Sequence, residues 1–544
     1  MEVATVSLAS GHIRGDRPSL AYGTAGFRAG AEKLDHILFR MGVLAAMRSK
    51  VLGGKPVGVM VTASHNPERD NGTKLVEPMG EMLPVEWEAH ATALANASDN
   101  ALAQTLENLL VTLSVNLEVR ADVIVGRDTR SSSAQLALAV CDGVGSLQPS
   151  AVQLLGLSTT PQLHYLVRCK NTDGGYGYPS LVGYANKLVG AYDSLIKDTA
   201  STTNKYKPNL SIDCANGVGG VALRQMLPGL QNAGLAVTLA NDGSGPLNDG
   251  CGADFVKIKQ CAPCGAALSP GSRAASVDGD ADRVVYYFAD DASTFRLLDG
   301  DRIALLLAHY LAVLLKRATV QDLRLGIVQT AYANGSSTAC AVDLLGADNV
   351  LCAKTGVKHC HHAALALDVG CYFEANGHGT VLFSERCVQR LCDSVQSGGS
   401  IGVAAKQFLQ LRDVINEAVG DAISVILAVE AVLRSLDWSC AEWLAMYSDL
   451  PNRQVKVVVS DRGIFETTDA ERKCVKPEGL QVAIDEIVAG FERGRAFVRP
   501  SGTEDVVRVY AEALTVDATL RLAQAVVDLV YERSGGVGFK PQVV

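Results

Sequence analysis

The sequence lacks an apolar run long enough to cross a lipid bilayer. The longest nearly uninterrupted run, residues 303–315, contains His309 and is shorter than the ~20 apolar residues that a membrane-spanning helix needs. The first residues also lack the basic segment followed by an apolar segment that marks a secretory signal. We therefore expect no membrane partner and a buried helix at residues 303–315.

Positive charge is not in excess either. Lys and Arg number 49 against 58 Asp and Glu, which gives a net charge of −9. Non-specific binding to nucleic acids or to anionic membranes requires clustered cations. The sequence therefore predicts no nucleic-acid partner, and no obligate protein partner is predicted.

The fourteen cysteines show no spacing typical of a disulfide framework. Many lie inside apolar segments, and such a pattern in a long chain is typical of reduced thiols in a cytoplasmic protein. Cys261 and Cys264 have a C-x-x-C spacing but no second pair accompanies them, which argues against a zinc site.

A length of 544 residues favours three to four domains. Hydrophobic residues make up 48% and charged residues 20% of the chain, an ordinary globular balance. Short apolar runs that end in polar residues alternate with helix-like segments, which indicates an α/β fold class. The predicted strands are residues 57–62, 122–126, 210–214, 325–330 and 370–374. Ligands of such folds gather at the carboxyl ends of the strands.

Ser64 lies in the loop of residues 62–67 (TASHNP), directly after a predicted strand. A serine in such a loop is a candidate nucleophile, although the same residue types also form ordinary surface turns. The loop contains no G-x-S-x-G motif, which counts against an ordinary hydrolase.

Three carboxylates occur in residues 278–283 (DGDADR), beside another strand-like run. Asp278, Asp280 and Asp282 at this spacing can converge on a hard cation such as Mg²⁺. Arg283 stands where a calcium-binding EF-hand loop needs glycine, so that site is rejected. The alternative is a solvated acidic turn, which mutual repulsion of the carboxylates makes unfavourable.

Two further loops suit a sugar phosphate. Residues 374–380 (EANGHGT) offer donors and acceptors for hydroxyl groups, although a plain glycine-rich turn is the alternative. Residues 499–504 (RPSGTE) combine an arginine fork, hydroxyls and backbone N–H groups into an anion site, with Arg508 nearby, although they also have the spacing of a helix start. Residues 217–220 (GVGG) do not match a nucleotide-binding fingerprint and predict a strand-to-helix turn.

Nine motifs taken together, in their order along the chain, resemble the α-D-phosphohexomutase superfamily. They are residues 22–28 (YGTAGFR), 62–67 (TASHNP), 71–74 (NGTK), 126–130 (GRDTR), 278–283 (DGDADR), 329–335 (QTAYANG), 355–359 (TGVKH), 374–380 (EANGHGT) and 499–504 (RPSGTE).

The resemblance implies a four-domain α/β architecture around a central cleft. Three related mixed α/β domains would span residues 1–178, 179–298 and 299–449, followed by a smaller α+β domain at 450–544. By the same resemblance Ser64 would be phosphorylated, and Asp278, Asp280 and Asp282 would hold Mg²⁺ together with an oxygen of the serine phosphate.

The resemblance also implies roles for the residues around the sugar phosphate. Arg28, His65 and Lys74 would flank the reacting phosphate, with Lys74 a candidate for proton transfer. The residues expected to bind substrate are Arg283, Lys358, His359, Glu374, Asn376, Gly377, Arg499, Ser501, Gly502, Thr503 and Arg508.

The function that this resemblance implies is conversion of N-acetylglucosamine 6-phosphate to the 1-phosphate through a 1,6-bisphosphate, a step toward UDP-N-acetylglucosamine. Asn376 and Gly377 suit an N-acetyl group, because they combine an amide with missing side-chain volume. The nearest alternative is a phosphoglucomutase or phosphomannomutase acting on non-acetylated hexose phosphates. A metal-dependent phosphatase and a non-catalytic sugar-phosphate sensor remain as more distant alternatives.

Overall fold

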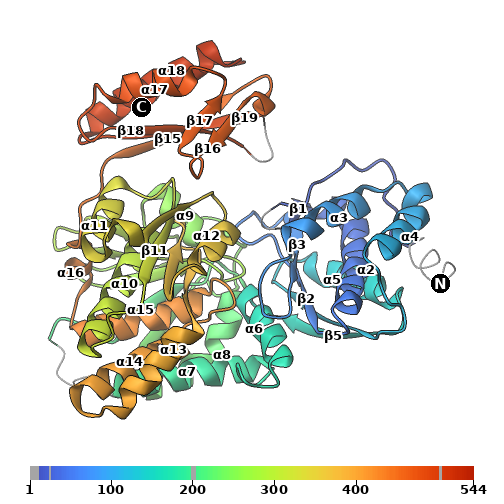
Figure 1. Ribbon diagram of the computed structural model, residues 1–544, viewed down its shortest axis with the longest axis horizontal. Helices are drawn as coiled ribbons and strands as arrows, with labels where there is room; N and C mark the ends of the chain where they lie inside the picture. Colours follow the sequence, from blue (N-terminus) through green and yellow to red (C-terminus); the bar gives the residue numbers. More distant parts are fainter. Residues whose placement is uncertain (1–10, 24–25, 198–203, 267, 502–504, 544) are drawn as a thin grey trace. The chain divides into compact units, whose positions relative to one another are not determined.

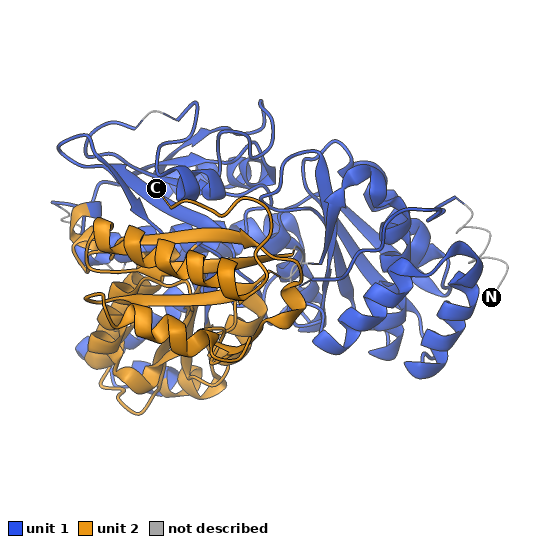
Figure 2. Ribbon diagram, turned by 90° about the horizontal axis from the view of Figure 1, so that it is seen from above, with its two compact units in different colours: residues 1–299, 376–381, 391–440 blue, residues 300–375, 382–390, 441–544 orange. Residues whose placement is uncertain are grey.

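The computed structural model describes residues 11–23, 26–197, 204–266, 268–501 and 505–543. The chain forms two compact units (Figure 2). Unit 1 comprises residues 1–299, 376–381 and 391–440, and unit 2 comprises residues 300–375, 382–390 and 441–544. The chain therefore leaves unit 1 after residue 299 and returns to it at residues 376–381 and 391–440, while residues 441–544 again belong to unit 2. The division into four domains stays a prediction.

The first sheet of unit 1 has the strand order β1-β3-β2-β4-β5. Strands β2, β4 and β5 run parallel, whereas β3 pairs antiparallel with both β1 and β2. The strands are β1 (Phe27–Gly30), β2 (Val57–Val61), β3 (Asp70–Val76), β4 (Ala121–Arg127) and β5 (Ser150–Leu157). The predicted strands at residues 57–62 and 122–126 are thereby confirmed as β2 and β4.

Both faces of this sheet are covered by helices. Alternate residues of β2 separate the two layers: Val57, Val59 and Val61 belong to the core with α2 (Asp35–Val51) and α5 (Ser133–Gly145), whereas Met60 packs with α6 (Thr160–Asn171). Helices α2 and α5 approach through glycines, because a Cβ on Gly42 would lie 2.1 Å from the Val140 carbonyl oxygen. Burial on both faces explains why β2 reads as a continuous apolar run.

The second sheet of unit 1 has the order β10-β9-β8-β6-β7, with β8, β6 and β7 parallel and β9 and β10 antiparallel. Its strands are β6 (Asn209–Asp213), β7 (Ala236–Ala240), β8 (Arg273–Val277), β9 (Val284–Ala289) and β10 (Phe295–Leu298). Its helices are α7 (Leu181–Lys197), α8 (Val218–Asn232), α9 (Ala253–Lys259), α14 (Gly399–Val414) and α15 (Ala422–Leu436). Gly217 is the N-cap of α8, which confirms the predicted strand-to-helix turn.

Unit 2 contains most of a third sheet, in the order β12-β11-β13-β14. Its strands are β11 (Leu325–Thr330), β12 (Val350–Ala353), β13 (Val369–Phe373) and β14 (Gly379–Phe383), and its helices are α10 (Gly300–Arg317), α11 (Gly335–Leu345) and α12 (Val357–Ala364). Helix α10 contains the apolar run at residues 303–315, which is buried as predicted except at the half-buried residues His309, Ala312 and Val313.

The last part of unit 2 is an antiparallel sheet with the order β15-β19-β18. Figure 1 shows α17 (Leu480–Val488) and α18 (Val516–Arg533) lying against one face of this sheet. The strands are β15 (Asn452–Val458), β18 (Arg495–Pro500) and β19 (Val506–Glu512), with a separate pair of β16 (Glu466–Thr468) and β17 (Lys473–Lys476). The predicted α/β fold class is therefore confirmed.

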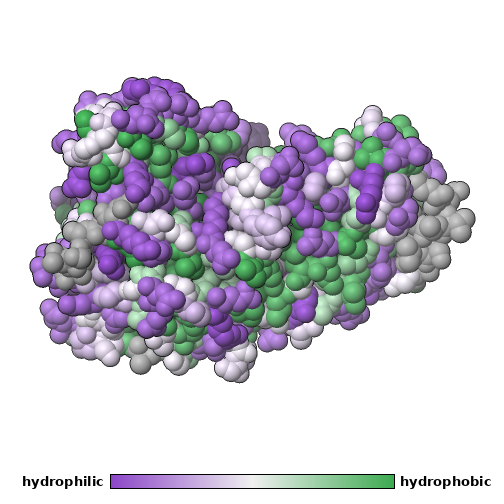
Figure 3. Space-filling view, turned by 90° about the horizontal axis from the view of Figure 1, so that it is seen from below, coloured by the Kyte–Doolittle hydropathy of each residue, from purple (hydrophilic) through white to green (hydrophobic). Residues whose placement is uncertain are grey.

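The remaining helices are α3 (Val85–Asn96), α4 (Leu102–Thr112), α13 (Glu385–Gln396) and α16 (Cys440–Leu444). Among the described residues, no helix combines the length and the apolar character that crossing a membrane would require. Figure 3 shows a surface on which hydrophobic areas are interrupted by hydrophilic residues. All fourteen cysteines lie among the described residues and are free thiols.

Candidate active site

Ser64 is buried in the loop that follows β2. Its backbone φ is +54°, the left-handed region that non-glycine residues rarely adopt. Its hydroxyl donates a hydrogen bond to Asp278 Oδ2 at 2.7 Å, and its N–H donates to Thr62 Oγ1 at 2.9 Å. The structure thus brings the predicted nucleophile onto the predicted metal-binding loop.

The acidic loop connects β8 to β9, and its three aspartates are buried together. One carboxylate oxygen from each of Asp278, Asp280 and Asp282 lies within 4.8 Å of the others. Lys74 Nζ, on β3, lies 2.9 Å from Asp280 Oδ2 and 2.9 Å from Asp282 Oδ2. Four of the predicted residues therefore form one buried charge cluster.

The environment separates the pKa values of these groups. Burial raises the pKa of Asp278 well above its usual range, and the charges of Asp282 and Asp280 add to this. Burial acts in the same direction on Asp282, but the charges of Lys74, His378 and Arg283 together outweigh it and bring the pKa of Asp282 well below the usual value. The pKa of Lys74 is raised, because the two carboxylates outweigh the desolvation of the ammonium. Lys74 is therefore an ammonium ion at neutral pH.

The donor set of the acidic loop fits a hard divalent cation. Asp280 Oδ1 and Asp282 Oδ1 are buried, and neither accepts a hydrogen bond within the described part of the chain. Buried carboxylate oxygens that accept no hydrogen bond are unfavourable, and oxygen ligands of this kind are those that Mg²⁺ prefers. The three aspartates therefore suit Mg²⁺ on chemical grounds.

Three helices fix the backbone of the acidic loop. The first N–H of α8 (Val218) donates to the Gly279 carbonyl at 3.1 Å, that of α6 (Thr160) to Asp280 at 3.2 Å, and that of α15 (Ala422) to Ala281 at 3.1 Å. The N-terminal N–H groups of a helix have no partner within the helix, so each is used here to hold one carbonyl. Helix N-termini also favour nearby negative charge.

The other predicted site residues of unit 1, Arg28, His65 and Arg283, lie on or beside the same loop. Arg283 Nη1 lies 3.2 Å from Asp254 Oδ1, and His65 Nε2 lies 3.6 Å from Asp254 Oδ2. Burial lowers the pKa of His65, and the charge of Arg283 lowers it further. Burial likewise lowers the pKa of Arg28, together with the charge of Arg283. His65 is therefore a neutral imidazole beside the hydroxyl of Ser64.

Asn376 and Gly377, two of the predicted substrate-binding residues of the sugar loop, belong to unit 1. Asn376 Oδ1 accepts a hydrogen bond from the backbone of His378 at 3.0 Å. Gly377 has a φ of +87°, and a Cβ there would lie 1.9 Å from the Val284 carbonyl oxygen. The start of β9 thus fills the space beside Gly377. This close approach by itself explains why the position holds a glycine.

The predicted phosphate-binding residues lie in unit 2. Arg499 on β18 and Arg508 on β19 are directly opposed cross-strand partners, so their side chains leave the same face of the sheet. Arg499 Nε donates to Glu471 Oε1 at 2.7 Å. The Ser501 carbonyl accepts from Arg462 Nη1 at 2.9 Å. Gly502 and Thr503 lie outside the described residues.

The remaining predicted substrate residues lie near the start of α12. Lys358 and His359 are in its first turn, after the turn of Thr355 and Gly356. Glu374 Oε1 accepts from the Gly356 N–H at 3.1 Å, and Glu471 Oε2 accepts from the Thr355 N–H at 2.9 Å. This turn therefore connects the predicted sugar carboxylate to the counter-ion of Arg499.

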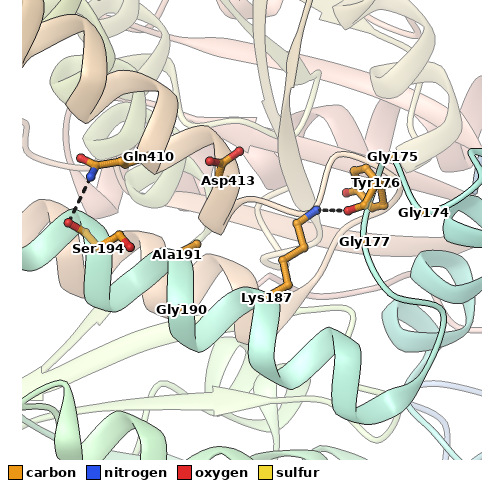
Figure 4. A pocket seen from close by; sticks show the side chains of 10 residues that line it. All are labelled: Gly174, Gly175, Tyr176, Gly177, Lys187, Gly190, Ala191, Ser194, Gln410 and Asp413. Atoms are coloured by element: carbon orange, nitrogen blue, oxygen red, sulfur yellow. Dashed lines mark hydrogen bonds between the residues drawn. The ribbon is translucent and has the colours of Figure 1, made fainter.

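A pocket of about 510 Å³ lies elsewhere in unit 1 (Figure 4). Lys187 Nζ donates to the Tyr176 carbonyl at 2.8 Å and lies 3.6 Å from the centre of the Tyr176 ring. Burial lowers the pKa of Lys187 to about 8. The pocket is lined by Gly174, Gly175, Tyr176, Gly177, Lys187, Gly190, Ala191, Ser194, Gln410 and Asp413. None of the predicted site residues lines it.

Family models match the chain along most of its length. The models for phosphoacetylglucosamine mutase AMG1, domains II and III, match residues 179–285 and 299–438. The models for phosphoglucomutase/phosphomannomutase match residues 30–102 and 96–176 (alpha/beta/alpha domain I) and 455–529 (C-terminal domain). A protein of Sus scrofa named phosphoacetylglucosamine mutase is 50% identical over 98% of this chain and 97% of its own. The chain belongs to the phosphoacetylglucosamine mutase family.

Solved structures agree with this membership. An N-acetylphosphoglucosamine mutase of Aspergillus fumigatus, in complex with GlcNAc-6P and magnesium, has a TM-score of 0.93 and 46% identity, covering 98% of this chain and 99% of that chain. A variant of the same mutase, in complex with glucose 1,6-bisphosphate, has a TM-score of 0.92 and 46% identity over the same shares. The resemblance to the phosphohexomutase superfamily is therefore confirmed.

Several residues in contact with the predicted site were not found from the sequence. They are Asn248, Asp254, Thr160, Ala422 and Glu471. Thr160 follows a strand and precedes a proline, which is a recognisable helix start. The other four carry no local signal that distinguishes them from ordinary loop or helix residues.

Proposed function

We propose that this protein interconverts N-acetylglucosamine 6-phosphate and N-acetylglucosamine 1-phosphate, as an isomerase that works through a phosphoserine and a 1,6-bisphosphate. The observation that carries the proposal is the hydrogen bond of the buried Ser64 hydroxyl to Asp278, inside a buried triad of carboxylates. The names of the relatives at 46–50% identity supply the substrate class.

In the first half-reaction a free hydroxyl of the sugar attacks the phosphorus of phosphorylated Ser64. The bond from phosphorus to Ser64 Oγ breaks, a bond from phosphorus to the sugar oxygen forms, and the hydroxyl proton ends on Ser64 Oγ. Ser64 then donates this proton in a hydrogen bond to Asp278, which is the contact that the structure contains. The second half-reaction returns the other phosphate to Ser64.

Asp278, Asp280 and Asp282 would hold Mg²⁺ together with an oxygen of the serine phosphate. When bound, Mg²⁺ neutralises charge on the transferring phosphoryl group. Lys74, held by Asp280 and Asp282, places an ammonium beside that group and has a proton to give. Arg28, His65 and Arg283 complete the surroundings of the reacting phosphate.

The phosphate that is not reacting would bind to Arg499, Ser501, Gly502, Thr503 and Arg508, with Lys358, His359, Glu374, Asn376 and Gly377 around the sugar. The opposed pair of Arg499 and Arg508 supports this part of the proposal, because two guanidinium groups on one sheet face suit a phosphate. A single nucleophile that serves both ends of a hexose needs such an anion site for the idle phosphate.

The test is turnover of N-acetylglucosamine 6-phosphate by purified protein with Mg²⁺, followed by ³¹P NMR. Appearance of the 1-phosphate is expected, and steady release of inorganic phosphate would identify a phosphatase instead. Because two of the matching family models describe phosphoglucomutase/phosphomannomutase domains, glucose and mannose phosphates are compared in the same assay. Faster turnover of these non-acetylated substrates would favour the alternative function.

We also propose that Ser64 is phosphorylated in the purified protein and that the protein is cytoplasmic. The free state of all fourteen cysteines supports a reducing compartment. Peptide mass spectrometry tests the first statement by locating a phosphate on residue 64. Microscopy of the tagged full chain tests the second, and a signal confined to an organelle would contradict it.

A further inference from the structure

The backbone of Ser64 needs external support to keep its position. A left-handed φ of +54° is sterically unfavourable for a residue with a side chain, and such conformations persist only where the surroundings hold them. The Ser64 hydroxyl contributes by its hydrogen bond to Asp278. A phosphorylated Ser64 has no hydroxyl proton, so this hydrogen bond is lost in the state that transfers the phosphoryl group.

Two side chains hold the carbonyl groups of this loop whatever the state of the hydroxyl. Asn248 Nδ2 donates to the Ser64 carbonyl at 2.9 Å and to the Asn66 carbonyl at 3.0 Å. Arg130 Nη2 donates to the same two carbonyls, at 3.1 Å and 2.7 Å. The Ser64 loop is therefore gripped from two directions at the same oxygens.

Asn248 is itself firmly placed, and it lies on the side of the acidic loop. Its own N–H donates to the Ala215 carbonyl at 2.9 Å. A Cβ on Gly279 would lie 2.7 Å from the Ser64 carbonyl oxygen and 3.0 Å from Asn248 Nδ2. Asn248 thus meets the nucleophile loop where that loop touches the loop of the three aspartates.

We propose that Asn248 is a positioning residue for phosphoryl transfer, which keeps Ser64 in its left-handed conformation by holding the carbonyls of Ser64 and Asn66. The proposal rests on the proposed function, in which Ser64 carries the phosphoryl group. Its contribution is largest in the phosphorylated state, where the hydrogen bond from Ser64 to Asp278 is absent. Transfer depends on geometry, and a displacement of about 1 Å can lower a rate roughly a hundredfold.

The variant Asn248→Asp removes the donor while it keeps the shape of the side chain. Asp, like Asn, tolerates the left-handed backbone that residue 248 adopts, with φ +57°. Asn171→Asp is the matched control, because Asn171 Nδ2 also donates to two backbone carbonyls, those of Pro56 and Val167, each at 2.9 Å. Pro56 precedes β2, so the control also removes two hydrogen bonds from a side-chain amide to backbone carbonyls. It does so near the end of β2 opposite to Ser64.

We expect kcat to fall roughly tenfold to a hundredfold in Asn248→Asp, with KM within about twofold of the wild type. Single-turnover phosphorylation by glucose 1,6-bisphosphate, followed by intact mass, is expected to slow by the same factor. In that step a bond from phosphorus to a sugar oxygen breaks, a bond to Ser64 Oγ forms, and the serine proton goes to the sugar. Asn171→Asp is expected to leave both rates unchanged.

Hydrogen–deuterium exchange of residues 62–67 supplies a readout that needs no activity. We expect faster exchange there in Asn248→Asp and in Asn248→Ala, but not in Asn171→Asp. The proposal is overturned if exchange in these residues matches the wild type, or if both variants transfer phosphate as fast as the control. A wild-type protein without mutase turnover would refute the proposed function, while the exchange of residues 62–67 would still decide whether Asn248 holds Ser64.

Discussion

The Ser64 cluster of unit 1 and the Arg499 cluster of unit 2 are built in opposite ways. Each polar group of Ser64 has a fixed partner: the hydroxyl binds Asp278, the N–H binds Thr62, and the carbonyl binds Arg130 and Asn248. Arg499 is partly exposed, and a single carboxylate, that of Glu471, pairs with its Nε. A reacting group needs fixed geometry, whereas a group that grips and releases a phosphate needs a partner that can be exchanged.

The nucleophile provides the strongest test of this contrast. We expect Ser64→Ala to lower mutase turnover by on the order of 10⁴-fold or more, because no other group takes the phosphoryl. Ser146→Ala, at a buried serine whose hydroxyl donates to the Gly143 carbonyl, serves as the control. Near-normal turnover of Ser64→Ala in the ³¹P assay would remove the phosphoserine from the mechanism.

The acidic triad provides the second test. We expect the three close carboxylates to favour metal binding and to destabilise the metal-free protein. Asp278→Asn is expected to lower kcat roughly a hundredfold and to weaken Mg²⁺ binding measured by calorimetry. The same change is expected to raise the Tm of the metal-free protein. Burial and two neighbouring carboxylates raise the pKa of Asp278, so its charged form destabilises the folded state at neutral pH.

Asp213→Asn is the control for this triad, because burial raises the pKa of Asp213 as well, but each of its two carboxylate oxygens accepts a hydrogen bond from an N–H group, which an amide nitrogen cannot do. Its replacement is expected to lower the Tm and to leave Mg²⁺ binding unchanged. If metal-free Asp278→Asn melts below the wild type, the crowded carboxylates contribute to stability and the contrast between the triad and Asp213 disappears.

Replacing Glu471, the counter-ion of Arg499, is expected to have a smaller effect, and one that improves substrate binding instead of impairing the enzyme. Glu471→Gln is expected to lower the KM for sugar phosphate about twofold to fivefold, because the incoming phosphate no longer displaces a carboxylate from Arg499. Arg499→Ala is the comparison, with KM expected to rise roughly tenfold or more. An increase of KM in Glu471→Gln would show that Glu471 positions Arg499 instead of competing with the substrate.

Acid provides the smallest effect, which concerns a buried histidine of unit 1. His164 is buried on α6 with its Nδ1 at 2.7 Å from the Gly80 carbonyl oxygen, and burial is the main cause that lowers its pKa to about 4. The unfolded imidazole titrates near 6.5, so stability is complete above that pH and is lost as the pH falls toward 4. Hydrogen exchange in this window is expected to increase around His164, and His164→Asn is expected to reduce that increase.

Much of the fold was readable because its signals are local. Strand β2 and helix α10 are apolar segments of the right length, and β11 spans the predicted residues 325–330. The acidic loop was readable for the same reason, since three carboxylates within five residues must lie close together. Arg508 was expected near the loop of residues 499–504, but only the register of β18 and β19 makes it the cross-strand partner of Arg499.

The contacts that hold the acidic loop could not be predicted from the sequence, because they use backbone N–H groups, which nearly every residue has. Val218, Thr160 and Ala422 hold the acidic loop through backbone N–H groups, and no side chain announces such a role. Ala422 comes after residues 300–375 of unit 2 in the chain but belongs to unit 1. Tertiary packing decides this assignment, and no local sequence pattern indicates it. Glu471 is one acidic residue among many in a surface hairpin.

The sequence alone determined which chemical groups this protein has: a serine after a strand, three clustered carboxylates and an arginine-bearing anion loop. The tertiary structure decided how these groups are held. Ser64 lies 214 residues from Asp278 and 184 residues from Asn248 along the chain, yet it is hydrogen-bonded to both. Local patterns cannot specify such distances, because the packing of two separate sheets and their helices brings the loops together.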